Sequence, residues 1–152
     1  MNKIIFLDSG PLSLLAHRLD LLLAQECRAW MARHVRAGNR VLIPEIIDYE
    51  LRRELLHAGK LQSVSRLDAI ATTPDFYLPL TTPAIRLAAD LWAKVRNQGL
   101  PTTNSQELDV DVILAAQVLI TNANPLEKIV ATTNINHLSR FVNADLWQNI
   151  AV

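Results

Sequence analysis

The chain has little of several features that mark common classes of protein. Its 152 residues include one cysteine, Cys27, which excludes an intramolecular disulfide and a zinc site built from several cysteines. The four histidines lack the spacing of a zinc motif such as HExxH, so zinc is not expected. Lys and Arg together number 15, as do Asp and Glu, so no overall positive field draws the chain to nucleic acid. Any contact with a polyanion must therefore be local.

Long apolar runs and linkers are also missing. Stretches such as "IIFL" and "VILAA" end well before the roughly 18 residues that a membrane span needs. The N-terminus lacks the form of a signal peptide, and together with the lone cysteine this predicts a cytoplasmic protein without membrane contact. Because 50% of the residues are hydrophobic and no Gly/Ser-rich stretch divides the chain, we expect one domain over residues 1–152.

Strand and helix patterns alternate along the sequence. Short apolar runs predict strands over residues 3–7, 39–43, 75–80 and 128–133, with a weaker one over 145–150. Helical spacing of apolar residues predicts helices over 12–37, 44–59, 61–70, 82–99 and 107–120, and a short turn over 135–141. This alternation predicts an α/β domain whose mainly parallel sheet, of about four to five strands, is covered by helices on both faces.

The last long helical pattern opens with an unusual amount of negative charge. In "ELDVDVILAAQVLI" the acids Glu107, Asp109 and Asp111 precede an almost wholly apolar stretch. One acidic residue is enough to cap a helix and complement its dipole. The additional carboxylates therefore predict a bound cation. Since residues two apart do not share a helix face, Asp109 is expected to be the N-cap or a helper, and Asp111 the main ligand.

Other candidate ligands follow strands, where binding sites form in parallel sheets. Asp8 comes directly after the first strand, although "DSGP" is also ordinary turn chemistry, and both interpretations stay open. Asn134 follows the fourth strand. Glu50 lies on the helix after the second strand, and periodicity alone favours a surface position for it.

Four stretches, taken in order, resemble the sequence blocks of PIN domains, in particular those of small single-domain VapC-type ribonuclease toxins. They are "IIFLDSGPL", "IPEIIDYELRREL", "LDVDVILAAQVL" and "IVATTNINHL". The resemblance implies a three-layer α/β/α PIN-like domain. It places Asp8, Glu50 and Asp111 at the acidic positions of the family pattern, and Ser9 at the small hydroxyl residue after the first acid.

The last block departs from that pattern. Thr132, Asn134 and His137 match it, but a further carboxylate that many family members carry there is missing. Asn134 can ligate a metal through its amide oxygen or hold a water, and Asp109 is an alternative source of charge. The resemblance therefore leaves open whether one or two metal ions are bound.

The resemblance and the residue chemistry together give a functional hypothesis. Carboxylates around one cleft repel one another unless a cation neutralises them, and hard oxygen ligands select Mg²⁺ or Mn²⁺. We expect a metal-dependent endoribonuclease that hydrolyses RNA phosphodiester bonds as the toxin of a toxin–antitoxin pair. The expected catalytic residues are Asp8, Glu50, Asp111 and Asp109, of which Asp8, Glu50 and Asp111 are the metal ligands. The expected supporting residues are Ser9, Thr132 and Asn134, and the expected substrate contacts are Arg52 and Arg53.

Partner surfaces and rival functions also follow from the sequence. The Leu-rich segment "LSLLAHRLDLLLAQ" predicts a homodimer face or a groove for an antitoxin protein, with ordinary core as the alternative. The main rival is a non-catalytic PIN-like module that binds RNA or protein, and the missing acid supports it. A receiver domain is disfavoured because "LPLTTP" stands where its middle strand would end in Asp. A phosphatase of the haloacid dehalogenase type is disfavoured because "DSGP" supplies a single Asp.

Overall fold

The computed structural model describes residues 2–99 and 105–152, apart from the side chains of Ser105, Asn136 and His137. The strands in these ranges are β1 (Ile4–Leu7), β2 (Arg40–Pro44), β3 (Tyr77–Leu78), β4 (Lys128–Thr132) and β5 (Ala144–Leu146). The α-helices are α1 (Ser9–Leu15), α2 (Leu22–Arg36), α3 (Glu45–His57), α4 (Leu61–Ala71), α5 (Thr82–Asn97) and α6 (Ser105–Ile120). Short 3₁₀ turns cover Pro125–Glu127, Asn136–Arg140 and Trp147–Asn149.

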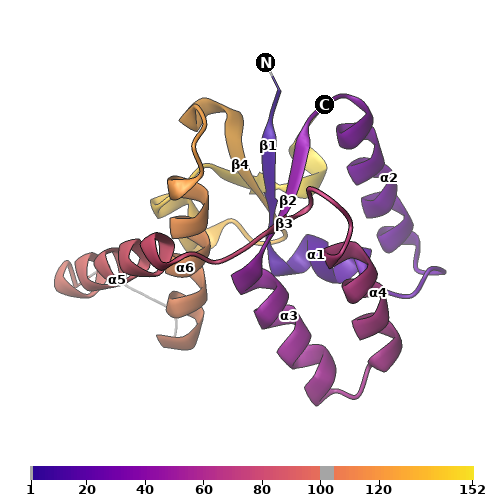
Figure 1. The fold of residues 1–152 in the computed structure, drawn as a ribbon, viewed down its shortest axis with the longest axis horizontal. Coiled ribbons are helices and arrows are strands. Elements are labelled where there is room, and N and C mark those ends of the chain that lie inside the picture. The colour runs from indigo at the N-terminus through magenta and orange to yellow at the C-terminus, as the bar shows by residue number, and fades with distance from the viewer. Residues whose placement is uncertain (1, 100–104) are drawn as a thin grey trace.

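The strands form one sheet in which every pair is parallel, in the order β3-β2-β1-β4-β5. The central strand β1 is buried along its whole length, which explains its uninterrupted apolar sequence. Figure 1 shows α5 and α6 on one side of the strands and α2 and α4 on the other. The predicted α/β class, with a parallel sheet between helical layers, is confirmed.

The order of the strands marks the place for a binding site. From β1 the chain proceeds outward through β2 and β3 on one side, and through β4 and β5 on the other. The direction of the order reverses between β1 and β4, and in parallel sheets binding sites form at the carboxyl ends of strands at such a switch point. Asp8 directly follows β1, and Thr132 is the last residue of β4. Both residues therefore lie at this switch point.

Three predicted elements differ in extent. The helix predicted over 12–37 is two helices, α1 and α2, which pack against each other across a break at residues 16–21. The break leaves Leu19 and Leu22 exposed at 65% and 67%, whereas Trp30, later on α2, is buried. The strand predicted over 75–80 shortens to Tyr77–Leu78, and that predicted over 145–150 is replaced by β5 and a 3₁₀ turn. The local spacing of apolar residues did not reveal where these elements begin and end.

Buried apolar side chains form two clusters. The larger surrounds β1, β2 and β4 and includes the inner faces of α1, α2 and α3. The smaller joins α5 to α6, so α5 is held mainly by its contact with α6. Over residues 2–99 and 105–152, no helix combines the length and the apolar character needed to cross a membrane.

Candidate active site

Asp8 is held in place by contacts from two elements. Its backbone N–H donates to the carbonyl of Ala131 at 2.9 Å, and its side chain caps α1 by accepting from the Ser9 N–H at 2.8 Å. The other carboxylate oxygen, Oδ2, accepts from the Thr132 hydroxyl at 2.7 Å. Thr132 is fully buried. Burial raises the pKa of Asp8, while the bonds from Thr132 and Ser9 lower it.

Glu50 extends from α3 toward the same place. Its side chain is hydrogen-bonded to Ser9, the residue whose backbone N–H also donates to the Asp8 carboxylate. Burial is the largest cause that raises the pKa of Glu50, followed by the negative charge of Asp8. The Ser9 bond and the positive charge of Arg53 lower it. Asp8 and Glu50 are therefore close enough to repel each other, with Ser9 between them.

Asp111 on α6 is the third acid at this place. Burial raises its pKa to about 7, helped by the charges of Asp8, Glu50 and Glu107, and opposed by Arg140. The carboxylates of Asp8 after β1, Glu50 on α3 and Asp111 on α6 thus act on one another, although they are far apart in the sequence. The structure places the three acids that the sequence suggested as metal ligands near enough for their charges to act on one another.

Asp109 does not lie with them. α6 begins at Ser105, so Asp109 is inside the helix and the prediction that it is the N-cap is wrong. Side chains two positions apart in an α-helix point about 200° apart around its axis, so Asp109 and Asp111 lie on different faces. Asp109 is exposed on its face, beside Trp92 of α5. There it lines an open apolar hollow of about 310 Å³ between α5 and α6.

Glu107 takes the place expected for Asp109. It lies four residues before Asp111 on α6, hence on the same helix face, and its charge raises the pKa of Asp111. The spacing of four was visible in the sequence, but the expectation that Asp109 lies before the first helical turn concealed its meaning. The fourth acid at this place therefore comes from α6, and β4 is followed by the neutral Asn134.

The described contact of Asn134 is made by its backbone. Its N–H donates to the Thr132 hydroxyl oxygen at 3.0 Å, so the loop after β4 orients the group that binds Asp8. The side chain of Asn134 is exposed. The side chain of His137, which matched the same sequence block, lies outside the described residues.

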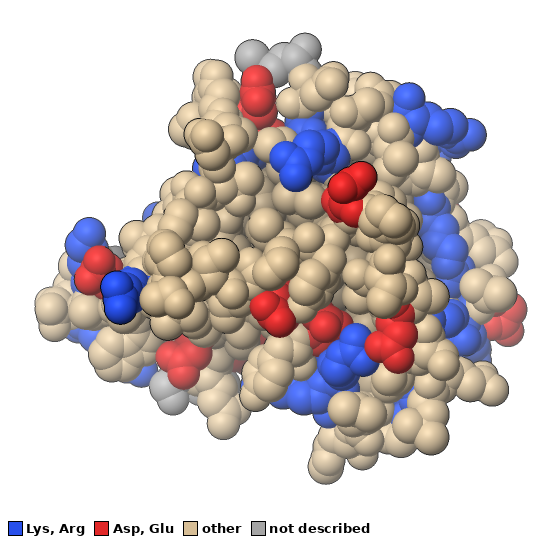
Figure 2. Space-filling view, in the orientation of Figure 1, with Lys and Arg blue, Asp and Glu red and all other residues tan. Residues whose placement is uncertain are grey.

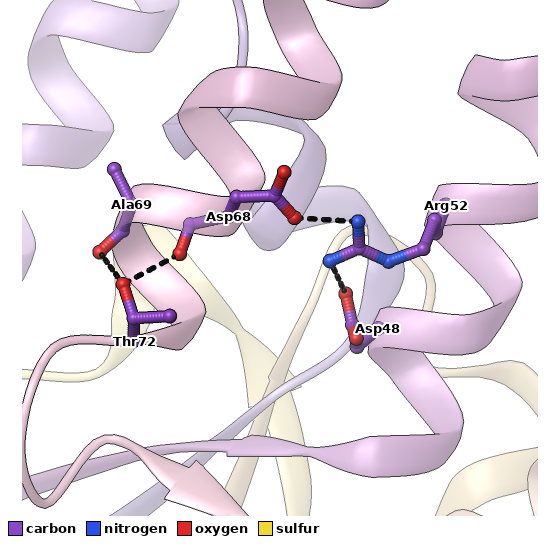
Figure 3. Close-up of polar contacts among 5 residues, drawn as sticks. All are labelled: Asp48, Arg52, Asp68, Ala69 and Thr72. Atoms are coloured by element: carbon purple, nitrogen blue, oxygen red, sulfur yellow. Dashed lines mark hydrogen bonds and ion pairs between the residues drawn. The ribbon is translucent and has the colours of Figure 1, made fainter.

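The two predicted substrate contacts differ in their surroundings. Arg52 is bound to two carboxylates, Asp48 on its own helix at 3.0 Å and Asp68 on α4 at 2.6 Å (Figure 3). It therefore fastens α3 to α4. Arg53 is exposed, stacks over the Tyr49 ring at 5.1 Å, and is near enough to Glu50 to lower its pKa.

These surroundings predict opposite effects of two matched substitutions. Arg53→Met is expected to weaken RNA binding about threefold to tenfold at low salt without changing the unfolding free energy. Arg52→Met is expected to lower the unfolding free energy by about 1 kcal/mol, because it breaks two partly exposed ion pairs, and to leave RNA binding unchanged. Urea denaturation and a filter-binding assay separate the two effects. A larger loss of RNA binding in Arg52→Met would reverse the assignment.

Gly10 allows α1 to approach the loop after β4. A Cβ at this position would lie 2.3 Å from Oγ1 of Thr133 and 2.9 Å from its Cβ, which is closer than real atoms approach. Gly10→Ala is therefore expected to push α1 away from β4 and destabilise the fold by about 1–3 kcal/mol. Thermal unfolding checks this, and the added substitution Thr133→Ala is expected to recover part of the loss. An unchanged melting temperature in Gly10→Ala would show that α1 and the loop after β4 have room for a methyl group between them.

Comparisons with known proteins agree with this architecture. No protein-family model matches the chain, and no curated protein does. Among solved structures, VapBC2 from Rickettsia felis, bound to a DNA fragment from its promoter, matches with 18% identity and a TM-score of 0.66, over 95% of this chain and 98% of the other. VapBC-1 from nontypeable Haemophilus influenzae matches with 17% identity and a TM-score of 0.63, over 96% and 99%.

A third structure, FitAcB from Neisseria gonorrhoeae, matches with 18% identity and a TM-score of 0.64, over 96% of this chain and 99% of the other. The chain has a VapC-like PIN fold. The resemblance to PIN domains that the sequence blocks suggested is confirmed at the level of the fold. At identities of 17% and 18%, the matches show the fold alone.

The acids of this PIN fold fit a hard divalent cation by their chemistry. Asp8, Glu50 and Asp111 offer carboxylate oxygens, and each has a pKa raised by burial, so a positive ion would relieve their repulsion. Among the described residues, no three His, Cys, Asp or Glu side chains lie close enough together to surround an ion. Mg²⁺ keeps several waters, so it can be held without every carboxylate touching it.

Proposed function

We propose that this protein is an Mg²⁺- or Mn²⁺-dependent endoribonuclease that hydrolyses RNA phosphodiester bonds. The observation that supports this most is the meeting of Asp8, Glu50 and Asp111 at the carboxyl ends of β1 and β4, where each is partly buried and repels the others. Such an arrangement destabilises a fold unless a cation neutralises the charge, and carboxyl groups with perturbed pKa values cluster at functional sites. The three carboxylates would hold the ion. When bound, the ion would supply an activated water and stabilise charge on the phosphate.

The other residues of the site keep these carboxylates oriented. The Thr132 hydroxyl and the Ser9 N–H fix both oxygens of Asp8, so its carboxylate does not rotate freely. Ser9 also binds Glu50, which couples the positions of two proposed ligands. Asn134 fixes the Thr132 hydroxyl through its N–H. These groups would preorganise the ligands and take no proton in the reaction.

Positive charge near the acids is local, as the balanced composition requires. Figure 2 shows Lys and Arg side chains scattered among Asp and Glu over the visible face, with neither sign covering it. Two arginines act directly on the proposed ligands: Arg53 lowers the pKa of Glu50, and Arg140 lowers that of Asp111. We assign them the role of drawing the phosphate backbone toward the acids.

Cleavage of a mixed structured RNA pool tests the proposal. Purified wild-type protein is expected to cut RNA with Mg²⁺ or Mn²⁺ and to stop when EDTA is added. Asp8→Asn keeps the size of the side chain but removes its charge, and it is expected to lower cleavage at least about 1,000-fold. Asp109→Asn, on the other face of α6, is the matched control and should cut normally. Equal inactivity of the folded wild type and Asp8→Asn would overturn the proposal.

A protein partner is part of the proposal. The solved neighbours of this fold are VapBC and FitAcB structures, which supports an antitoxin protein that binds this chain. We propose that it covers three exposed leucines, Leu19 in the break before α2 and Leu22 and Leu23 at the start of α2. Co-expression with the product of the adjacent gene, followed by mass measurement, tests this. Leu22→Asp is expected to release the partner, and retention in this variant would contradict the surface assignment.

The same mass measurement tests the proposed homodimer. The chain alone is expected to elute at twice its mass of 17.0 kDa. A monomer at all concentrations would contradict that proposal without affecting the proposed cleavage.

The alternative is a non-catalytic module with the same fold. It is favoured by the neutral Asn134 after β4 and by the absence, in the described residues, of a ready-made three-ligand cluster. This alternative predicts RNA or protein binding that neither EDTA nor Asp8→Asn changes. The cleavage experiment therefore separates the two functions.

A further inference from the structure

Gln117 has a buried polar side chain that takes no part in the proposed cleavage or partner binding. It lies on α6 and is 1% exposed. A buried amide is costly unless its donors and acceptor are paired, so its partners indicate what the residue does.

The amide of Gln117 connects three elements. Its Oε1 accepts from the backbone N–H of Ile46 at 3.3 Å, and its Nε2 donates to the carbonyls of Leu78 at 3.1 Å and Pro79 at 3.4 Å. Ile46 is in the first turn of α3, whose N-cap Pro44 makes no side-chain capping bond. Gln117 therefore caps α3 from another helix while it holds the chain that leaves β3.

The first residue of α3 completes this junction. Glu45 accepts from the Leu80 N–H at 2.7 Å, and its side chain is hydrogen-bonded to Tyr77. The start of α3 is thus tied to the exit of β3 by Glu45, and both are tied to α6 by Gln117. A rotation or slide of α3 against α6 would break these bonds.

The junction lies one helical turn from a proposed metal ligand. Ile46 and Glu50 are four residues apart and share a face of α3, while Asp111 is on the helix that carries Gln117. α3 and α6 contact each other directly. We propose that Gln117 is a positioning residue that, by fixing the first turn of α3 against α6, sets the spacing of Glu50 and Asp111 for a divalent cation. This inference rests on the proposed function.

A small displacement of α3 should be costly because Mg²⁺ and Mn²⁺ accept a narrow range of ligand geometry. Residues that support metal ligands typically contribute about 10-fold to 100-fold to metal affinity. We therefore expect Gln117→Met, which keeps the length of the side chain and removes its hydrogen bonds, to weaken Mn²⁺ binding by this factor.

Lys128, the first residue of β4, offers a matched control because its side chain is bound to the same helix. It is 7% exposed, and its Nζ donates to the carbonyls of Val118, Leu119 and Thr121 at 2.8, 3.3 and 3.0 Å. These contacts secure the C-terminal end of α6 to β4, whereas those of Gln117 join α6 to α3 and to the chain after β3. Lys128→Met should lower the melting temperature as Gln117→Met does, but it should leave Mn²⁺ affinity unchanged.

The experiment measures Mn²⁺ affinity by electron paramagnetic resonance, at a temperature where circular dichroism shows each variant folded. Weaker binding in Gln117→Met and normal binding in Lys128→Met would support the inference. Equal affinities in wild type and Gln117→Met would overturn it, and so would an equal loss in both variants. No Mn²⁺ binding by the wild type would instead overturn the proposed function.

Two further variants keep the test decisive if Gln117→Met does not fold. Gln117→Glu retains an acceptor for Ile46, and burial favours the protonated acid, which can donate to Leu78. It is expected to stay within about threefold of the wild-type affinity. Gln117→Asn is too short to reach both sides of the junction and is expected to lose at least about 10-fold. The reverse order of these two variants would contradict positioning by Gln117.

Discussion

Asp111→Asn is expected to raise the melting temperature of the metal-free protein at pH 8. Burial and the charges of Asp8, Glu50 and Glu107 raise the pKa of Asp111 from 3.8 to about 7. A carboxyl group with a pKa raised by folding destabilises the folded state as pH rises from its unfolded pKa to its folded pKa. The amide removes this destabilisation, although it also loses the attraction to Arg140.

After a discount for the partial exposure of this side chain, we expect a gain of about 1–2 kcal/mol, or about 2–8 °C. Thermal unfolding in EDTA at pH 8 and pH 4 measures it. The gain should shrink at pH 4, where the wild-type carboxyl is largely protonated in the folded state. Asp109→Asn, exposed on another face of α6, should change neither value. A lower melting temperature for Asp111→Asn at pH 8 would contradict the claim that burial and the neighbouring acids destabilise the ionised Asp111.

Thr132→Val is expected to weaken Mn²⁺ binding by about 10-fold to 100-fold. Valine keeps the shape of the buried side chain but removes the hydroxyl that donates to Asp8 and accepts from the Asn134 N–H. The bond from Thr132 lowers the pKa of Asp8 against the effect of burial, so its loss lets that pKa rise further. Because the ion requires the ionised carboxylate, binding should also shift to higher pH.

Thr132→Ser restores the hydroxyl and is the control for this prediction. It should recover most of the affinity and the wild-type pH dependence, even where the missing methyl group lowers stability. The measurement is Mn²⁺ affinity at several pH values from 5 to 8. If valine and serine variants bind alike, the hydroxyl does not orient Asp8.

The parts of the fold with strong local signals could be predicted from the sequence. The uninterrupted apolar run of β1, with Asp8 directly after it, indicated a buried strand that ends at a site. Alternating strand and helix patterns indicated the parallel sheet. The break between α1 and α2 could not be predicted, because apolar residues continue through it and become exposed there.

The site required more than periodicity. Glu50 resembles a surface residue by helical pattern, and only the PIN resemblance suggested that it faces the acids. Asp109 was chosen in place of Glu107 because Asp109 was expected to lie before the first helical turn, whereas α6 begins at Ser105 and contains it. Helix boundaries are the least predictable part of a sequence interpretation.

Long-range partners were the remaining obstacle. The ion pair of Arg52 with Asp68 joins α3 to α4, and the sequence pattern of α3 alone did not indicate it. Gln117 gave no signal in the sequence, since its partners lie on α3 and after β3. Pairings of this kind depend on how helices pack, which the sequence pattern of one helix does not contain.

Mn²⁺ binding to the wild-type chain is the measurement that tests the central claim most directly. In an electron paramagnetic resonance titration, the account predicts saturable binding that Mg²⁺ displaces and that Asp8→Asn weakens at least about 10-fold, with Asp109→Asn unchanged. Folded wild-type protein without saturable binding, or with the same affinity as Asp8→Asn, would contradict a cation site at Asp8, Glu50 and Asp111.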